Sequence, residues 1–325
     1  MNTGTNSIQD RSAAILVILS FISLAISYAT SILVARSLGP VGFESYAVAI
    51  ATLTLLSTLS ESGVGKLAIQ MLPVYQASGK WQLTAGFWRF SIRSVLLVSC
   101  LVALLVLLGD LSQQRTNEDH AILIAALFLP AAALAGVGID FVMAIRAPIL
   151  GAAIARLAIP TTTLVLMMLC MHFIRSFDAP WAVTCFGVGS MVGVILAICV
   201  YRKRSPTEAL KATPAFDRPY WIGECLTFLT LATLVSSIFR SSVIALDFLS
   251  LAPDDVASFA AAAETGGLIL LLSKSTDKYF QPYLQCLSNV TLGPRVMPCG
   301  NTDSFGSAQL AVYFCSSSSS VESQS

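Results

Sequence analysis

The sequence predicts an all-α polytopic membrane protein, and three observations support this fold class. Hydrophobic residues make up 55% of the 325 residues and charged residues only 11%, which is less than half of the roughly 25% found in soluble domains. Apolar runs near the length of about 20 residues that a helix needs to cross a bilayer recur along the chain. A thirteen-residue segment also occurs twice, and each copy lies between two of these apolar runs.

About eight transmembrane helices are expected in the first 272 residues. They cover residues 12–35, 45–68, 94–111, 121–143, 149–173, 181–201, 221–246 and 256–272, and the third and eighth are the shortest. The first run is too long for a cleaved signal peptide and lacks the small residues of a cleavage site. The second contains Glu61, Gly63, Gly65 and Lys66, so we expect its helix to loosen or tilt near its end.

The positive charges predict that the N-terminus lies in the cytoplasm, because cytoplasmic loops are enriched in Lys and Arg. With this orientation most of the 19 Lys and Arg residues fall on the inside, while Arg36, Arg115 and Arg175 lie in or beside outer loops. Aromatic side chains are expected at the inner membrane boundary, namely Trp81, Trp88, Tyr201, Tyr220 and Trp221.

The repeated segment predicts two parallel lobes. Residues 37–49 and 250–262 share six identical positions without a gap. Six predicted helices separate the copies, so both copies face the same side, as in transporters whose repeats are related by an axis along the membrane normal. Pro40 and Pro253 restrict the residue before them to extended conformations, so each ends a helix. The alternative is a recurrent hairpin turn without common ancestry.

Residues 35–47, together with Leu72-Pro-Val-Tyr75, resemble the start of the polysaccharide-biosynthesis membrane proteins. These are the oligosaccharide flippases of the multidrug/oligosaccharidyl-lipid/polysaccharide exporter superfamily. Residues 251–262 are similar to the same family's junction between helices 7 and 8. The resemblance covers roughly residues 12–285. It implies twelve or fourteen helices in two six-helix lobes around a V-shaped cavity, and transport of lipid-linked sugars from the inner to the outer leaflet by alternating access.

The chain departs from this family pattern in two respects. Residues 1–213 correspond to a complete first lobe, but residues 214–286 supply only the first two helices of a second lobe. Residues 287–325 are polar and include a run of serines at 316–320, a composition typical of disordered segments. We expect a truncated or frameshifted gene product, and the alternative is a natural short variant with a flexible tail.

Intramembrane arginines are the candidate substrate-binding residues, since a buried charge costs about 2.5–3.5 kcal/mol or more. The guanidinium of Arg240, among serines in the outer third of the seventh run, either pairs with a lipid-linked pyrophosphate or reaches the outer interface. Arg156 in the fifth run either faces the cavity or extends to the inner interface. Arg36 belongs to the first hairpin's family signature, and Leu249 takes its place in the second copy, which weakens a purely structural role.

Four further charged residues are candidates for ion coupling or gating. Asp140, near the inner end of the fourth run, either binds a coupling proton or sodium ion or is solvated at the interface. Glu61 and Lys66 flank a glycine-containing stretch and either line a cytoplasmic gate or reach lipid headgroups. Glu264 in the eighth run lies at a depth similar to Arg240, and a pair between them would be structural.

Other classes of function lack support in the sequence. There is no P-loop, and a net charge of +1 argues against a nucleic-acid partner. The eight cysteines are scattered and the two histidines are far apart, so we expect no metal, cofactor or disulfide framework. A membrane glycosyltransferase or polymerase would need a large outer loop with clustered carboxylates or arginines, which is missing. An ion-coupled drug exporter would need an acidic or aromatic cavity.

The sequence therefore predicts a flippase of the cytoplasmic membrane and not an enzyme. Its expected partners are membrane lipids, a lipid-linked sugar substrate, and a polysaccharide polymerase and glycosyltransferases. A non-functional fragment is the remaining alternative.

Overall fold

The computed structural model describes the backbone of residues 3–113, 120–145, 147–173, 177–248 and 259. Side chains are described for residues 15–109, 121–145, 147–173, 177–209, 211–234 and 259. All described residues belong to one compact unit, Met1–Ser275. Within them the secondary structure is helical without strands, which confirms the all-α class.

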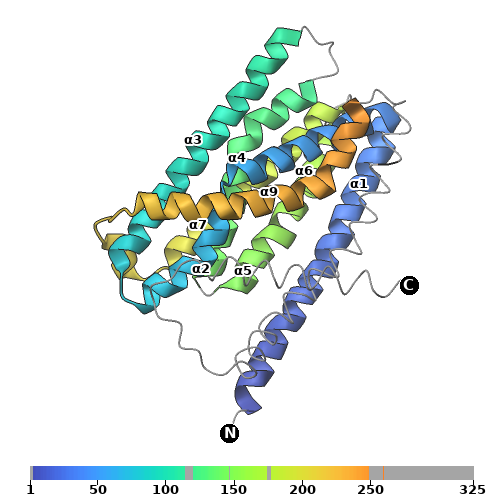
Figure 1. Ribbon diagram of the computed structural model, residues 1–325. Coiled ribbons are helices and arrows are strands. Elements are labelled where there is room, and N and C mark those ends of the chain that lie inside the picture. Colours follow the sequence, from blue (N-terminus) through green and yellow to red (C-terminus); the bar gives the residue numbers. More distant parts are fainter. Residues whose placement is uncertain (1–2, 114–119, 146, 174–176, 249–258, 260–325) are drawn as a thin grey trace, which may run out of the picture. The chain divides into compact units, whose positions relative to one another are not determined.

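The helices follow the predicted order along the chain (Figure 1). They are α1 (Thr3–Ser60), α2 (Val64–Ala77), α3 (Trp81–Gln113), α4 (His120–Ala144), α5 (Pro148–Ala153), the π-helix η2 (Ile154–Ala158), α6 (Ile159–Phe173), α7 (Ala179–Arg204), α8 (Thr207–Lys211) and α9 (Arg218–Phe248). Within the described part of the chain, five segments are long and apolar enough to cross a membrane, namely Ile15–Ser60, Trp81–Gly109, Ala121–Ala144, Pro148–Phe173 and Ala179–Arg204. The helix α9 covers the seventh predicted run. The eighth run and the second copy of the repeat lie outside the described residues, apart from the helical Phe259.

The long helix α1 consists of two helices that meet at Gly39. This glycine has φ 70° and ψ −175° and is followed by Pro40, whose fixed φ suits the first position of a new helix. The chain turns back at this point (Figure 1). The structure therefore confirms that Pro40 separates the first two predicted membrane helices.

Two predicted boundaries need correction. The third run was expected over residues 94–111, but α3 already begins at Trp81. Its first turns carry polar residues and were for that reason missed, although Thr84, Phe87 and Ser91 are buried against the bundle. The second run ends at Ser60, and a new helix, α2, begins at Val64.

The fifth run is helical throughout but contains the π-turn η2 immediately before Ile159 and Pro160. Pro160 has no N–H for the carbonyl of Arg156, and its ring would clash with that carbonyl in a regular α-helix. A wider turn of π type relieves this clash, and such turns are common at functional sites.

Helix α4 is the centre of the bundle and packs against α7, α1, α3 and α2. Small residues allow the helices to approach closely, as expected for membrane proteins. Gly187 of α7, for example, lies directly on the ring of Phe128 of α4. One core cluster includes Val34, Leu53 and Met167, and a second includes a group of aromatic side chains near the opposite end of the helices.

That aromatic group differs from the predicted interfacial belt. The rings of Trp88 and Tyr201 stack with centroids 4.0 Å apart. Trp221 is completely buried and packs edge-on against Phe87. These residues were expected at a lipid boundary because of their position in the sequence, but contacts with one another and with Phe141 make them part of the core.

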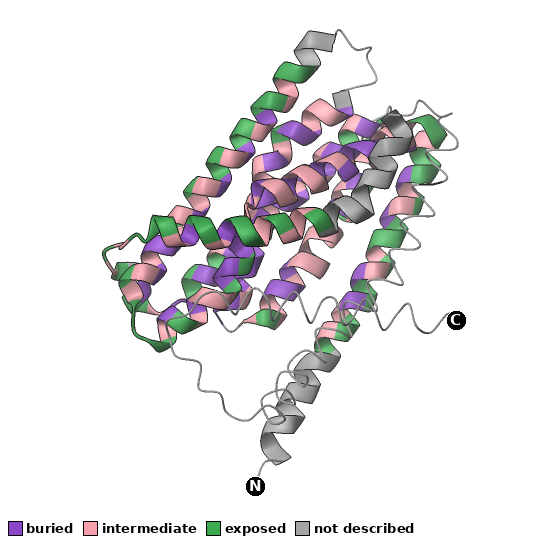
Figure 2. Ribbon diagram, in the orientation of Figure 1, coloured by how far each residue is buried: buried purple, intermediate pink, exposed green. Residues whose placement is uncertain are grey.

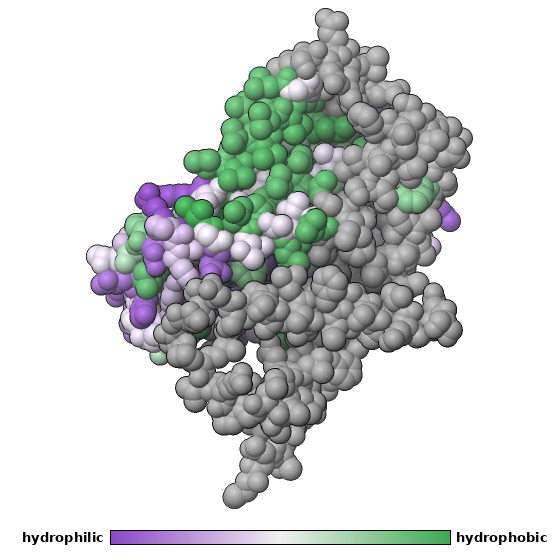
Figure 3. Space-filling model, viewed as in Figure 1, coloured by the Kyte–Doolittle hydropathy of each residue, from purple (hydrophilic) through white to green (hydrophobic). Residues whose placement is uncertain are grey.

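The outer surface of the bundle is apolar, as a bilayer environment requires. Large hydrophobic side chains are exposed along α3, namely Leu97, Leu101, Leu104, Leu105 and Leu108. Figure 2 shows that exposed and buried positions alternate along α3. Figure 3 shows a continuous hydrophobic surface over the upper part of this helix. The hydrophilic residues in Figure 3 gather at the end where α3 begins.

Basic residues gather at one end of the bundle. Lys80 precedes α3, the cluster Arg202–Arg204 ends α7, and Arg218 begins α9. These segments meet at one end, since the backbone N–H of Ala215 donates to the carbonyl of Gln82 at 3.0 Å. The end of α6 at Phe173 and the start of α7 at Ala179 lie at the other end of the bundle (Figure 1). The relative placement agrees with the predicted topology.

Candidate functional site

The most distinctive feature of the site is a break in a membrane helix at residues 61–63. Ser62 has φ 52° and Gly63 has φ 69°, so the chain cannot continue as an α-helix. The N–H of Val64 bonds to the carbonyl of Glu61 at 3.0 Å and α2 starts there. Discontinuous membrane helices form substrate and ion sites in many transporters, because their ends present polar backbone groups inside the membrane.

Two glycine contacts hold this break against α4. A Cβ atom on Gly136 would overlap the carboxylate of Glu61, and a Cβ atom on Gly65 would overlap the carboxylate of Asp140. Residues 136 and 140 are four apart and therefore lie on one face of α4. The absence of side chains at Gly136 and Gly65 is thus what allows Glu61 and Asp140 to occupy the same interface.

An ion pair completes the interface between α2 and α4. The Nζ atom of Lys66 lies 2.9 Å from Oδ2 of Asp140. The Asp140 side chain is 11% exposed and the Lys66 side chain 53% exposed, so the pair connects a buried carboxylate to an accessible ammonium. We call Glu61, Lys66 and Asp140 the charge cluster. With all three ionised, it carries one excess negative charge.

Asp140 belongs to a segment that is long and apolar enough to cross a membrane, Ala121–Ala144, and Glu61 and Lys66 follow the end of another such segment at Ser60. Asp140 is four residues before the end of α4 at Ala144, which corresponds to about 6 Å along the helix. The sequence had suggested solvation at the interface for Asp140 and contact with headgroups for Glu61 and Lys66 as alternatives. The structure adds that all three side chains lie together.

Helix α9 presses on the break from another side. A Cβ atom on Gly63 would lie 2.5 Å from the carbonyl oxygen of Cys225 and 2.6 Å from the amide nitrogen of Leu229, so the two backbones are in contact. Nearby, Nε1 of Trp221 donates to the hydroxyl of Tyr75 at 3.2 Å. Helix α9 is therefore fixed to the segment that carries the charge cluster.

Arg156 occupies a separate polar position on the π-turn. Its Nη1 donates to the carbonyl oxygen of Leu16 at 3.3 Å, and the hydroxyl of Ser20 donates to the same oxygen at 2.7 Å. Among the described residues no carboxylate forms an ion pair with Arg156. A guanidinium has five N–H donors, so this partly buried residue retains donors for an anion.

Of the remaining candidates, only Arg36 has a described side chain, and it is not brought to either position. Arg36 is exposed on α1, three residues before the turn at Gly39. The backbone of Arg240 belongs to α9, but its side chain lies outside the described residues, as does Glu264 as a whole.

Sequence reasoning missed the pairing of Lys66 with Asp140, because 74 residues separate them. The glycines at 65 and 136 were the available signal. A glycine within an apolar helix often marks a close approach, but one sequence does not show to which partner.

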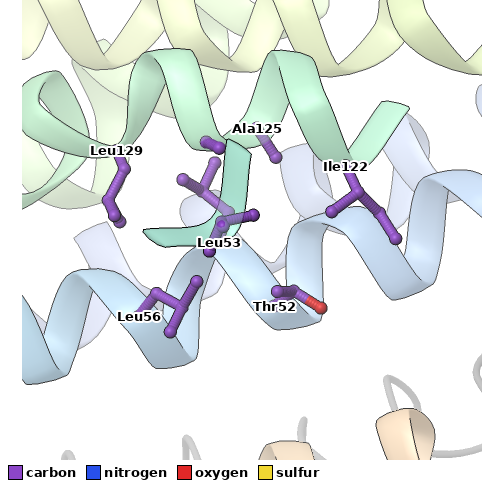
Figure 4. A pocket seen from close by; sticks show the side chains of 8 residues that line it. Thr52, Leu53, Leu56, Ile122, Ala125 and Leu129 are labelled. Atoms are coloured by element: carbon purple, nitrogen blue, oxygen red, sulfur yellow. The ribbon is translucent and has the colours of Figure 1, made fainter. Parts of the chain in front are cut away.

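A small apolar hollow lies elsewhere in the bundle, between α1, α3 and α4. It is lined by Thr52, Leu53, Leu56, Val106, Ile122, Ala125, Ala126 and Leu129, and Figure 4 shows the leucines of α1 and α4 converging on it. Thr52 contributes its one hydroxyl, and none of the charged candidates lines it. Its chemistry suits side-chain packing and not a sugar or a phosphate.

Comparison with known proteins gives one match. A family model described as polysaccharide biosynthesis protein matches residues 11–272. No curated protein and no solved structure matches the chain. The matched range begins within α1 and includes all of α2 to α9, and therefore the charge cluster and Arg156.

Proposed function

Because the chain belongs to the polysaccharide biosynthesis protein family, we propose that it translocates lipid-linked oligosaccharide across the cytoplasmic membrane by alternating access. Its family and its apolar helices make it a multi-pass membrane protein of the flippase or exporter type. Members of this family are generally transporters and not enzymes, and we propose the same for this chain.

The physical problem of such transport is to move a charged, sugar-bearing headgroup through hydrocarbon. A protein solves it by offering polar and cationic groups within the membrane, while the lipid tail remains in the bilayer. The observation that supports this solution here is Arg156. It lies in the membrane-spanning part of the bundle, bonds to the carbonyl of Leu16, and has no carboxylate partner among the described residues. The planar fork of a guanidinium suits the oxygens of a pyrophosphate.

We assign Arg156 as the leading substrate-binding residue in this proposal. Arg240 and Arg36 remain further candidates, Arg240 for the outer part of α9 and Arg36 for the end of the bundle at which α1 turns back. The same cargo makes a polysaccharide polymerase and glycosyltransferases the expected partners, since they consume and produce lipid-linked sugars.

The charge cluster has a different role in this proposal. Its ion pair joins α2 to α4 near the end of the bundle that carries the basic residues. We propose that Lys66 and Asp140 close a cytoplasmic gate and that Glu61, at the helix break, takes part in its opening or in ion coupling. Glu264 is a candidate for the same role in the second lobe.

The direct test of the proposal is transport by the purified full chain in liposomes. A fluorescent lipid-linked oligosaccharide is placed in one leaflet, and its appearance in the other is measured by access of an added glycosidase. We expect transport by the wild type. Arg156→Gln should lower the rate about tenfold, since a hydrogen bond to a charged group contributes about 1.5–3 kcal/mol. Arg156→Lys should retain part of the activity.

The controls for this test separate the alternatives. A lipid-linked sugar without phosphate should be a poor substrate, and Arg156→Gln should not change its rate. Absence of transport by the wild type would overturn the proposed cargo. Transport of small cationic drugs in place of the lipid-linked sugar would indicate the drug-exporter branch of the superfamily.

The proposed orientation has its own test. Cysteines introduced at positions 115 and 254 should react with a membrane-impermeant maleimide added to intact cells, and a cysteine introduced at position 203 should react only after the membrane is opened. The native Cys199, near the same end of α7 as Lys203, provides the internal control. The opposite pattern would reverse the topology. Labelling of 115 and 254 from different sides would contradict the parallel repeat.

A further inference from the structure

Two thiols meet at the interface of α6 and α7. The Sγ of Cys185 donates to the Sγ of Cys170 at a distance of 3.6 Å, and both cysteines are free. Cys185 is buried and Cys170 is partly exposed. We propose that Cys170 and Cys185 are a disulfide-forming pair that covalently joins α6 to α7 near the outer face of the membrane.

The packing of the two helices supports this pairing. Gly193 and Gly189 of α7 lie against Ile159 and Thr163 of α6, respectively. A Cβ atom on either glycine would overlap the side chain opposite it. Cys185 lies four residues before Gly189 and therefore on the same face of α7. Cys170 follows Thr163 by seven residues, which is two turns on the same face. The thiols therefore face each other across a helix pair whose backbones already approach closely.

The distance that remains is small. A disulfide requires Sγ atoms about 2.05 Å apart and Cα atoms usually within 6.8 Å. Closing the gap from 3.6 Å needs a rotation of the cysteine side chains. The scattered spacing of the cysteines had predicted no disulfide framework, because spacing along the chain does not show which residues meet in an antiparallel helix pair.

The position of the pair gives an oxidant access. Cys170 is three residues before the end of α6 at Phe173, which is about 5 Å along the helix. The α6–α7 connection faces outward in the orientation proposed above. Disulfides persist on the outer face of the bacterial membrane and are rare in the cytoplasm. The inference thus depends on the proposed orientation but not on the proposed cargo.

The chemistry is a thiol–disulfide exchange with a disulfide-bearing oxidoreductase of the outer face. The more accessible thiol, Cys170, loses its proton and attacks the disulfide of the oxidant, forming a mixed disulfide and releasing one oxidant thiol. The deprotonated Cys185 then attacks the sulfur of Cys170 and releases the second oxidant thiol. Two protein thiols become one disulfide, and the disulfide of the oxidant becomes a dithiol.

The experiment uses the full chain with a protease site inserted at residues 174–176, expressed in a bacterial inner membrane. Cells are quenched with acid, free thiols are alkylated, and the purified protein is cleaved and examined on gels with and without reductant. We expect the two fragments to stay joined without reductant and to separate with it. The same result is expected for Cys199→Ser, which removes an exposed thiol at the other end of α7.

The outcomes distinguish the proposal clearly. Cys170→Ser and Cys185→Ser should each give separate fragments on both gels. Mass spectrometry of the wild type should show the cross-linked peptide, a readout that does not depend on the folding of a variant. Fragments that separate without reductant, together with both cysteines alkylated in the wild type, would overturn the proposal. The topology labelling described above tests the orientation separately.

Discussion

Replacing Asp140 by asparagine is expected to slow transport at least about tenfold and to open the cytoplasmic end of the bundle. The carboxylate accepts a hydrogen bond from the ammonium of Lys66 at 2.9 Å, and this ion pair joins α2 to α4. If this pair exists only in the closed state, its loss shifts the equilibrium toward the open state. A change of about 1.4 kcal/mol in this equilibrium corresponds to a tenfold shift. The free energy lost when a partly exposed pair is broken lies between the small value of surface pairs and the roughly 3–5 kcal/mol of buried pairs.

Accessibility separates a gate from a structural ion pair. Ser60, at the end of α1 beside the helix break, is completely buried, so a cysteine in its place should react slowly with a maleimide added from the cytoplasmic side. In the Asp140→Asn background we expect this reaction to become at least about tenfold faster, in line with the shift in population. The wild type and the Asp140→Asn variant, both without Ser60→Cys, show how much of the labelling comes from the native cysteines.

A reversal of both charges is the matched control. Asp140→Lys alone places two ammonium groups together and should abolish transport, whereas Lys66→Asp combined with Asp140→Lys restores an attractive pair and should recover part of it. Recovery shows that the pair acts as a unit. If Asp140→Asn leaves both the transport rate and the labelling of position 60 unchanged, the ion pair does not close a gate.

The fold could be predicted largely because a membrane helix is defined by local composition. A run of about 20 apolar residues has few alternatives in a bilayer, and the turn at Gly39-Pro40 follows from backbone restrictions on those two residues. The start of α3 at Trp81 could not be predicted in this way. Its first turns are polar by composition, and only the neighbours that bury Thr84 and Ser91 explain why the helix extends so far.

The candidate site was predictable in its residues but not in its arrangement. A charge in a membrane helix is conspicuous in any sequence, so Glu61, Lys66, Asp140 and Arg156 were identified individually. Their partners depend on which helices are neighbours and on where glycines remove side chains. The pairing of Lys66 with Asp140 and the contact of Arg156 with the carbonyl of Leu16 are tertiary facts. The burial of Tyr201 and Trp221, two of the five aromatic residues expected at the lipid boundary, has the same origin.

The contact of α9 with the helix break predicts a large loss of stability for Gly63→Ala. Gly63 has φ 69°, and a side chain in the left-handed region costs about 1–2 kcal/mol. The added Cβ would also meet the backbone of α9 at Cys225 and Leu229, and overpacking of this kind costs about 1–3 kcal/mol more. We expect the free energy of unfolding to fall by about 2–5 kcal/mol in total, measured by denaturation of the full chain in detergent.

Gly79→Ala isolates the contribution of the α9 contact. Gly79 has nearly the same backbone conformation, with φ 66°, but nothing lies within 4 Å of the position of its Cβ. The variant therefore carries the backbone strain without the clash and should lose only about 1–2 kcal/mol. Equal losses for the two variants would show that α9 does not press on the break. A larger loss for Gly63→Ala means that α9 cannot move without disturbing the segment that carries Glu61 and Lys66, which is the mechanical link that a gate driven by the second lobe requires.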